Sequence, residues 1–229
     1  MRRRAHKALF ITGTDTDVGK TTVACLLAKD ARKAGFHVGV MKPFASGSWE
    51  DTGKLRSASG STATQEEITP FFFKTPASAW AAALKEKVTV HLSEVDRVFR
   101  QLKHGCDILL VEGMGGVLVP ITQAFLVADL IKRWRIPVLL VARWELGTLN
   151  HTLLSLEALH RREIPVAGLI FNQTRPGKIG LVQRTNVEYF RQRKFPRILA
   201  TVQYSRHDSQ RRLRWEAGIR FWEGPNHLW

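Results

Sequence analysis

A chain of 229 residues with 44% hydrophobic content is long enough to bury a full core, and this length suits one globular domain. It has no run of 18 uncharged apolar residues, which excludes a membrane-spanning helix, and we expect no membrane partner. The basic start Met1–Arg4 precedes only a short strand-like run, so we expect no signal peptide. Cys25 and Cys106 lack metal-ligand spacing, and we expect them to be reduced core residues of a cytoplasmic protein.

The formal net charge of +15 is the one unusual bulk property, and the charge is densest between Arg175 and Arg214. Such a charge can mark a nucleic-acid or phosphate-rich partner. Here the charge is scattered over many segments, and no aromatic-basic ribbon or helix-turn-helix pattern accompanies it. We therefore expect a solvated basic surface and no nucleic-acid partner.

Apolar runs alternate with helical patterns along the chain, and most of these runs are continuously apolar, as in strands buried on both faces. The alternation predicts an α/β fold with a mostly parallel central sheet and helices on both faces. Ligands of such sheets bind beyond the carboxyl ends of the strands. The Ser/Thr/Gly-rich connection 44–66 is predicted to be a mobile loop over that site. The predicted strands are Ala8–Thr12, Val38–Met41, Ile108–Val111, Val138–Ala142, Val166–Phe171 and Ile198–Val202, and the predicted helices are Lys20–Ala34, Ser93–His104, Ala124–Arg133, Leu149–Arg161 and Lys178–Arg191.

A glycine-rich loop joins the first predicted strand to the first predicted helix. The backbone N–H groups of such a loop point at a phosphate, and the helix that follows offers its positive end. Lys20 is then placed to neutralise the β- and γ-phosphates, and the Thr21 hydroxyl to bind Mg²⁺. Five residues separate the two loop glycines, one more than in the common phosphate-binding loop. The expected nucleotide-binding residues of this segment are Gly13, Asp17, Val18, Gly19, Lys20, Thr21 and Thr22.

The loops after the second and third predicted strands carry a lysine and a glutamate. Lys42 ends the second strand, where a cation can stabilise charge on a transferring phosphoryl group, although an exposed lysine is the simpler interpretation of the residue alone. Glu112 ends the third strand and resembles the second Mg²⁺ contact of nucleotide hydrolases. The glycines that follow Glu112 allow a ligand to approach the backbone closely. We include the segment Glu112, Gly113, Met114 and Gly115 in the expected ATP site.

The later loops give weaker signals. Gly147-Thr148-Leu149-Asn150 opens a helix whose free N–H groups favour a carboxylate, although an ordinary helix cap explains the same residues. Asn172-Gln173 follows the fifth predicted strand and offers amide groups to a purine edge, with a simple turn as the alternative.

Taken in this order, the motifs resemble those of the dethiobiotin synthetase family. The resemblance runs from about Ala8 to Val202, and its most specific parts are the Gly13–Thr22 loop and Lys42-Pro43 with Ser46-Gly47. It implies a P-loop NTPase architecture and a homodimer. The substrates that it implies are a diamine, 7,8-diaminononanoate, with CO₂ or bicarbonate and ATP, and the implied cofactor is Mg²⁺.

The resemblance also assigns roles to individual residues. Lys42, Lys20 and Thr16 would be catalytic, supporting the carbamate and the transferred phosphoryl group. Ser46 would touch the diamine, and the helix start Gly147, Thr148, Leu149 and Asn150 would hold the substrate carboxylate from the partner subunit. Thr21 and Glu112 would hold the metal.

Three departures from the family pattern stand out. Where the family places a metal-binding aspartate after the lysine, ungapped counting reaches Ser59, which would be a weak replacement metal ligand, and Asp51 upstream in the same loop is the alternative. The loop after the last strand reads Ala200-Thr201-Val202-Gln203 in place of Gly-x-Ile-Pro, and Gln203 would border the base. Residues 205–229 match nothing in the family, so we divide the chain into a synthetase domain, 1–204, and a basic tryptophan-containing tail, 205–229.

Two other functions fit part of the sequence. A P-loop ATPase that partitions DNA or positions membranes would use the basic surface, but the Lys42 to Gly47 element has no evident role in it. A catalytically impaired nucleotide-binding relative would explain Ser59 and Gln203.

Overall fold

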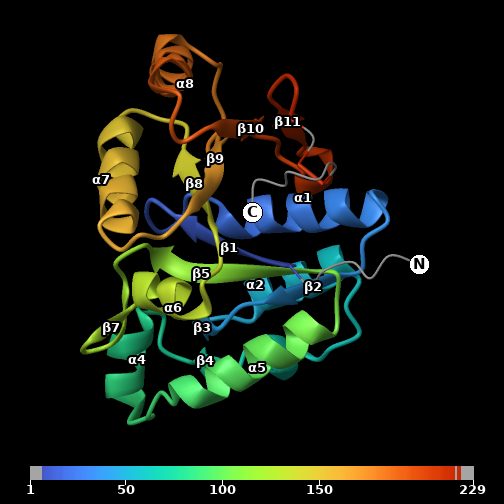
Figure 1. Cartoon of the computed structure of the whole chain (residues 1–229), viewed down its shortest axis with the longest axis vertical. Helices are drawn as coiled ribbons and strands as arrows, with labels where there is room; N and C mark the ends of the chain where they lie inside the picture. Colours follow the sequence, from blue (N-terminus) through green and yellow to red (C-terminus); the bar gives the residue numbers. More distant parts are fainter. Residues whose placement is uncertain (1–6, 220, 223–229) are drawn as a thin grey trace.

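The computed structural model describes residues 7–219 and 221–222. Its centre is a seven-stranded sheet in the order β11-β10-β9-β8-β1-β5-β2 (Figure 1). Adjacent strands in this sheet run parallel except β11, which is antiparallel to β10. The strands are β1 Lys7–Gly13, β2 Val38–Met41, β5 Ile108–Gly116, β8 Val138–Arg143, β9 Val166–Asn172, β10 Ile198–Val202 and β11 Leu213–Trp215.

Helices cover both faces of the sheet, which confirms the predicted α/β architecture. Two short strand pairs lie beside the main sheet: β3 Phe44–Ser46 with β4 Phe71–Phe73, and β6 Pro120–Thr122 with β7 Phe125–Leu126. The helices are α1 Lys20–Lys33, α2 Glu50–Ser59, α3 Gln65–Ile68, α4 Ala79–Glu86, α5 Leu92–His104, α6 Val127–Trp134, α7 Thr148–His160 and α8 Leu181–Arg193, with a 3₁₀ turn at Asp208–Gln210.

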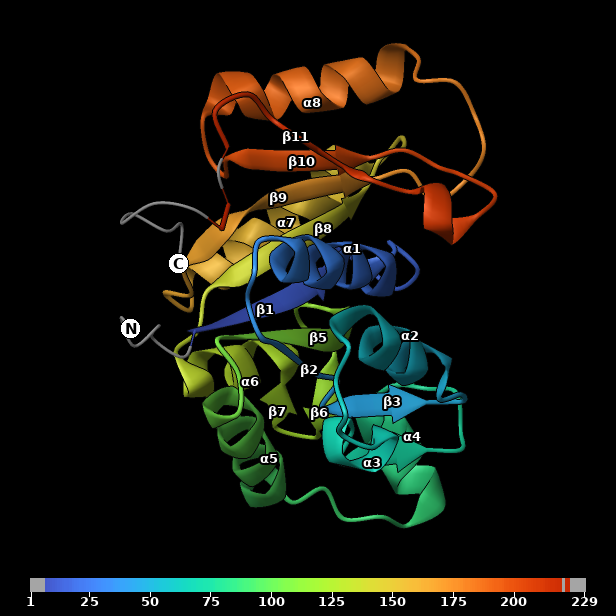
Figure 2. The same cartoon turned by 90° about the vertical axis from the view of Figure 1, so that its right-hand side faces the viewer.

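Two hydrophobic clusters, one on each face, explain why the strands read as continuous apolar runs. Successive side chains of a strand point to opposite faces. Leu9 and Ile11 of β1 accordingly belong to the cluster that α1 and α2 cover, whereas Ala8 and Phe10 belong to the cluster under α5, α6, α7 and α8. Figures 1 and 2 show α1 on one side of the sheet and α6 and α7 on the other. Because both faces of β1 are buried, the loop that follows it is held on a rigid strand.

The connection 44–66 is not the loop that its composition predicted. It contains β3, α2 and the start of α3. One face of α2 is buried and consists of Thr52, Leu55, Ala58 and Ser59, and this helix packs beside α1. Glu50 and Asp51 stand in its first turn, where acidic side chains favour the positive end of the helix. This helix therefore presents its amino-terminal end to the site that the mobile loop was expected to cover.

The division at residue 204 has no counterpart in the described residues. Trp215 and Leu213 of β11 pair with Ala200 and Val202 of β10, which extends the central sheet. Phe221 and Trp222 are buried in the cluster that contains α1, and the indole Nε1 of Trp222 donates to Asp30 Oδ2 at 2.8 Å. The described part of the predicted tail thus packs as part of the main domain, and residues 223–229 lie outside the described residues.

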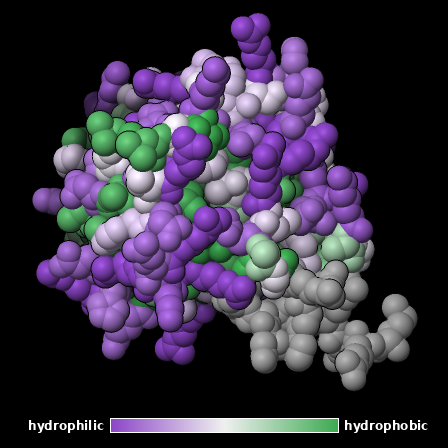
Figure 3. Space-filling view, turned by 90° about the horizontal axis from the view of Figure 1, so that it is seen from above, coloured by the Kyte–Doolittle hydropathy of each residue, from purple (hydrophilic) through white to green (hydrophobic). Residues whose placement is uncertain are grey.

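The face of the molecule at the end where α8 lies is mostly hydrophilic (Figure 3). Seen from the end where α8 lies, long hydrophilic side chains separate small hydrophobic patches (Figure 3). Among the residues that the structure describes, no helix is both long and apolar enough to cross a lipid bilayer.

Candidate active site

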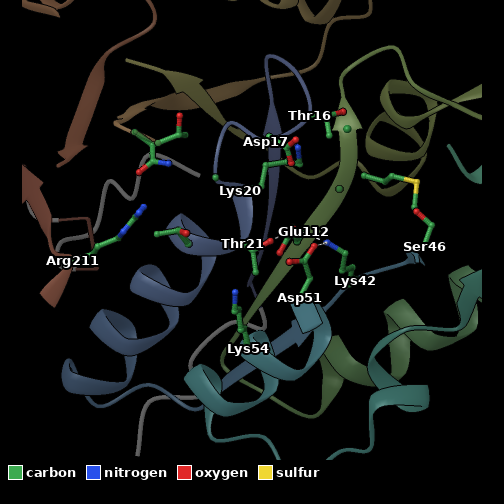
Figure 4. Close-up of a pocket in the computed structure, with 17 residues that line it drawn as sticks. Thr16, Asp17, Lys20, Thr21, Lys42, Ser46, Asp51, Lys54, Glu112 and Arg211 are labelled. Carbon is green, nitrogen blue, oxygen red and sulfur yellow. Dashed lines mark hydrogen bonds and ion pairs between the residues drawn. The ribbon is translucent and has the colours of Figure 1, made fainter. Parts of the chain in front are cut away.

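A cavity of about 430 Å³ opens beyond the carboxyl ends of the central parallel strands. It contains most of the residues that the sequence predicted for catalysis and ATP binding (Figure 4). Three lining residues were not predicted, Lys54, Thr174 and Arg211, and a fourth, Asp51, was predicted only as the alternative to Ser59. The predicted residues that line it are Thr16, Asp17, Gly19, Lys20, Thr21, Thr22, Lys42, Ser46, Glu112, Gly113, Met114, Gly115 and Asn172.

The glycine-rich loop wraps the amino-terminal end of α1. Gly19 caps the helix with φ of 85°, a left-handed conformation that glycine adopts readily. A Cβ atom at this position would come within 2.0 Å of the Asn172 amide, so a larger residue has no room. No acidic residue stands in the first turn of α1 to compete for its free N–H groups. The loop and the helix end therefore form an anion site.

Lys20 supplies the buried cation of this anion site. Its side chain leaves the start of α1, and Nζ donates to the Asp15 carbonyl oxygen at 3.0 Å. Burial lowers the pKa of Lys20 to about 8, with nearby Lys42 acting in the same direction and Glu112 opposing it. An anionic ligand that replaces the lost hydration would stabilise the charged form of this ammonium group.

Lys42 stands at the centre of a second charged cluster. Its Nζ lies 2.7 Å from Glu112 Oε1 and 2.7 Å from Asp51 Oδ2. Burial alone would lower the pKa of Lys42, but the two carboxylates outweigh burial and the net shift is upward. Lys42 is therefore an ammonium ion at neutral pH, which suits a cation that stabilises developing negative charge and not a general base.

Glu112 and Thr21 offer oxygen atoms that fit a magnesium ion. The Thr21 hydroxyl donates to Glu112 Oε1 at 2.8 Å, which brings both side chains to one place. The other carboxylate oxygen, Oε2, is buried and has no hydrogen-bond partner among the described residues. A buried carboxylate oxygen without a partner is costly, and a hard cation would satisfy it. The described residues contain no cluster of three His, Cys, Asp or Glu side chains, so nucleotide phosphates and water would complete the ligand set.

Asp51, and not Ser59, brings the further carboxylate to this cluster. Burial would raise the pKa of Asp51, but Lys42 outweighs it and holds this pKa below its usual range. Ser59 lies at the other end of α2, where it is buried and its hydroxyl donates to the Arg56 carbonyl at 3.0 Å. Ser59 therefore lies outside the cavity, because ungapped counting passes beyond the first turn of α2, and Asp51, the alternative, lies in the turn that lines the cavity.

We expect Asp51→Ala to raise the Mg²⁺ concentration needed for half-maximal activity, because the metal and phosphates lose a carboxylate at the cavity wall. Ser59→Asp should leave the Mg²⁺ titration unchanged, because it adds a charge outside the cavity. The Mg²⁺ dependence of ATP turnover measures both effects, with circular dichroism to confirm folding. If Ser59→Asp needs less Mg²⁺ for half-maximal activity than the wild type, position 59, and not Asp51, corresponds to the metal-binding aspartate of the family.

Three amide side chains at the carboxyl ends of β9 and β10 were predicted to contact the nucleotide, Asn172, Gln173 and Gln203, and they face different surroundings. Asn172 is fully buried, and its Nδ2 donates to the Val18 carbonyl at 2.9 Å, while Oδ1 has no partner among the described residues. Gln173 faces the backbone instead: it donates to the Gly177 carbonyl and accepts from the Tyr204 N–H. Gln203 and Gln173 do not line the cavity, so only Asn172 of the three predicted amides does.

The residues expected to touch the diamine are also divided. Ser46 ends β3 and lines the cavity near Lys42 (Figure 4). The helix start Gly147–Asn150 is absent from the cavity wall of its own chain. Gly147 caps α7 with φ of 88°, and the side chain of Asn150 is exposed to solvent. Gly13 and Val18 likewise do not line the cavity, although they belong to the same loop as residues that do.

Comparisons with known proteins agree with this geometry. Residues 7–211 match the family described as an AAA domain. A protein named ATP-dependent dethiobiotin synthetase from Anaeromyxobacter dehalogenans is 46% identical over 174 residues, which cover 74% of this chain and 78% of that protein. Proteins of the same name are 41% identical in Endomicrobium trichonymphae, over 73% of this chain and 79% of the relative, and 40% identical in Bacillus velezensis, over 79% of each.

Solved structures resemble the chain in fold at low sequence identity. McdA from Cyanthece has a TM-score of 0.53 at 14% identity, with 89% of this chain and 88% of that chain covered. The signal recognition particle receptor FtsY from Elizabethkingia anophelis has a TM-score of 0.52 at 14% identity, with 88% and 59% covered. At such identities the likeness concerns the architecture of the sheet and helices.

Proposed function

Because the chain belongs to the dethiobiotin synthetase family, we propose that it uses ATP to close a cyclic urea on 7,8-diaminononanoate with CO₂. One amine nitrogen attacks CO₂ and gives up a proton, forming a carbamate. A carbamate oxygen then takes the γ-phosphoryl group of ATP and releases ADP. The second amine attacks the carbonyl carbon of this carbamic-phosphoric anhydride, loses a proton, and expels phosphate as the ring closes.

The residues of the cavity support this sequence by positioning and charge. The glycine-rich loop would hold the phosphates together with Lys20, and Thr16 of the same loop would contact them as well. Asn172 would contact the nucleoside. Lys42 lies between Ser46 and the phosphate site, so its ammonium group would contact the carbamate and the oxygens of the transferred phosphoryl group (Figure 4). Phosphoryl transfer needs little covalent participation by protein, and such positioning supplies most of the catalysis.

Magnesium fits the oxygen atoms of Thr21, Asp51 and Glu112. When bound there it would neutralise charge on the β- and γ-phosphates and orient them. Lys42 would then exchange part of its contact with the two carboxylates for contact with the substrate oxygens. The buried, unpartnered Oε2 of Glu112 is the observation that supports this assignment best.

The Lys42 cluster, with Glu112 and Asp51 each 2.7 Å from one ammonium group, is the observation that carries the proposed function. The test is ATP hydrolysis in the presence and absence of the diamine and bicarbonate, with dethiobiotin identified by mass. A synthetase hydrolyses ATP only when both are present. ATP hydrolysis at the same rate with and without the diamine would favour a P-loop ATPase that partitions DNA or positions membranes. ATP binding without turnover would favour a catalytically impaired nucleotide-binding relative. Ser59 no longer supports impairment, because Asp51 supplies the carboxylate.

We further propose a homodimer that shares its sites. Leu146 directly precedes the cap of α7 and Leu154 lies within the helix, with 88% and 57% of their surfaces exposed, and the exposed Asn150 stands between them in the sequence. An exposed apolar stripe around a polar residue suits contact with a second copy. Asn150 would then reach the partner's cavity, which explains why its own cavity lacks it.

Mixed dimers test the shared site. Lys42→Ala and Asn150→Ala chains should each be inactive alone, whereas each mixed dimer contains one site with both residues intact. Random exchange should therefore recover about a quarter of wild-type activity. The activity of the mixture is compared with the fraction of mixed dimers, measured by native mass spectrometry. Confirmed mixed dimers without activity would show that each chain builds its own site.

A cytoplasmic location is part of the same proposal. Cys25 and Cys106 form no disulfide, and burial raises the pKa of their thiols to about 12 and about 11. Thiols with such high pKa values are weakly reactive, and two of them without a disulfide suit a reducing compartment.

A further inference from the structure

Arg211 is a cation on the wall of the proposed nucleotide cavity, and the proposed reaction gives it no role. It lies in the segment between β10 and β11, and it lines the cavity with Asn172 and Thr174. Figure 4 shows Arg211 on the side of Lys20 and Thr21 that is opposite Ser46 and Lys42. The cavity therefore has a phosphate site in its middle, the reacting end at Lys42 and a second end at Arg211.

The bound nucleotide must place its nucleoside toward Arg211. The γ-phosphoryl group has to face Lys42 and Ser46, since the acceptor binds there under the proposed function. A triphosphate laid across the loop before α1 then points its α-phosphate and nucleoside the opposite way. Asn172 also lines the cavity, and its unpartnered amide oxygen is available to a polar edge of the ligand.

The guanidinium group of Arg211 lies over the aromatic ring of Tyr204. The Arg211 Cζ atom lies 5.1 Å from the centre of the Tyr204 ring, a cation–π contact. The Tyr204 N–H donates to Gln173 Oε1 at 3.1 Å, and Gln173 is buried directly after Asn172. Gln173 thus ties the Tyr204 loop to the end of β9. A planar cation supported on one side by an aromatic ring offers a flat surface to the base of a nucleotide.

We propose that Arg211, supported by Tyr204, stacks on the base of the bound nucleoside triphosphate. This inference rests on the proposed function for the direction of the nucleotide. Stacking on a planar surface is tolerant of base identity, because every base has a π-face. Arg211 therefore contributes affinity for the nucleoside part, and the amide of Asn172 contributes the selection of the base.

Binding of ATP and of inorganic tripolyphosphate separates base contact from phosphate contact. Arg211→Ala should weaken ATP binding roughly five- to thirtyfold and change tripolyphosphate binding less than about twofold. Arg211→Lys keeps the positive charge but lacks the planar guanidinium group, so its affinity for ATP should be at least about fivefold lower than that of the wild type. Tyr204→Leu removes the support and should move in the same direction. Unchanged tripolyphosphate binding also shows that each variant is folded.

Arg214→Ala is the matched control, since Arg214 is an exposed arginine on β11 that does not line the cavity. It should bind ATP as the wild type does. Equal losses for ATP and tripolyphosphate in Arg211→Ala would make Arg211 a phosphate ligand and overturn the inference, as would wild-type ATP affinity in Arg211→Ala or Arg211→Lys. Failure of the proposed function gives a different result: the wild-type protein would make no dethiobiotin, whatever Arg211→Ala does to ATP binding.

Discussion

Replacement of Lys42 by alanine is expected to lower turnover by about a hundred- to a thousandfold while changing ATP affinity far less. The ammonium group of Lys42 is buried and fixed between two carboxylates before the reaction begins. Negative charge on the carbamate and on the transferred phosphoryl group reaches its full strength only during the reaction. A preorganised cation therefore stabilises the transition state more than the bound substrates.

Steady-state kinetics and calorimetry test the role of Lys42 together. The turnover number should fall, while the dissociation constant for ATP stays within a few fold of the wild type. Lys29→Ala is the matched control, because it removes an exposed lysine of α1 outside the cavity. An equal loss in ATP affinity and turnover would assign Lys42 to ground-state binding of the nucleotide and not to catalysis.

Lys20→Ala should show the opposite pattern, with the larger loss in ATP binding. A charge-assisted contact that is removed from a buried site costs about 1.5–3 kcal/mol, or roughly ten- to a hundredfold in affinity. Calorimetric titration with ATP measures the loss, and Lys29→Ala again serves as the control on the same helix. ATP affinity equal to that of the wild type would contradict the assignment of the loop to the phosphates.

The pH dependence of binding gives a second measure of Lys20. The free protein has a Lys20 pKa of about 8, because burial disfavours the charged form. Phosphate binds the protonated form, so it raises this pKa and binding takes up protons near pH 8. Affinity for ATP should therefore fall as the pH rises from 7 to about 9, and Lys20→Ala should lose most of this slope.

The sequence predicted the parts of the site that follow directly from buried strands. Lys42 and Glu112 each stand at the carboxyl end of a continuous apolar run. Neighbouring parallel strands end at the same edge of the sheet, so the two residues come together independently of the structure of the segments that connect the strands. Asp51 was only the second choice, after Ser59, for the metal-binding aspartate of the family, because helix α2 was not recognised in the sequence. Gly53 and several small polar residues hide the helical period of Thr52, Leu55 and Ala58, whose burial is visible only in the folded chain. Counting through an unrecognised helix then led to Ser59.

Residue type alone also could not give the direction of the amide side chains. Asn172 and Gln173 are adjacent and chemically alike, yet one faces the cavity and the other binds Gly177 and Tyr204. Neighbouring residues at the end of a strand point to opposite sides, and the exact end of a strand is hard to predict. Arg211 was missed because nothing near it in the sequence marks a nucleotide site; only the pairing of β11 with β10 brings its segment back to the cavity.

The contact of Trp222 with Asp30 joins the helix of the nucleotide loop to a segment that the ribosome makes much later. Asp30 lies on α1, whereas Trp222 and Phe221 cover the same hydrophobic cluster from the far end of the chain. During synthesis β1 and α1 emerge early, whereas β8, which pairs with β1 in the sheet, emerges later, and the covering side chains of β11, Phe221 and Trp222 emerge last among the described residues. The apolar face of α1 is therefore expected to stay partly uncovered until Phe221 and Trp222 have emerged, and transiently exposed apolar surface of this kind promotes aggregation during folding.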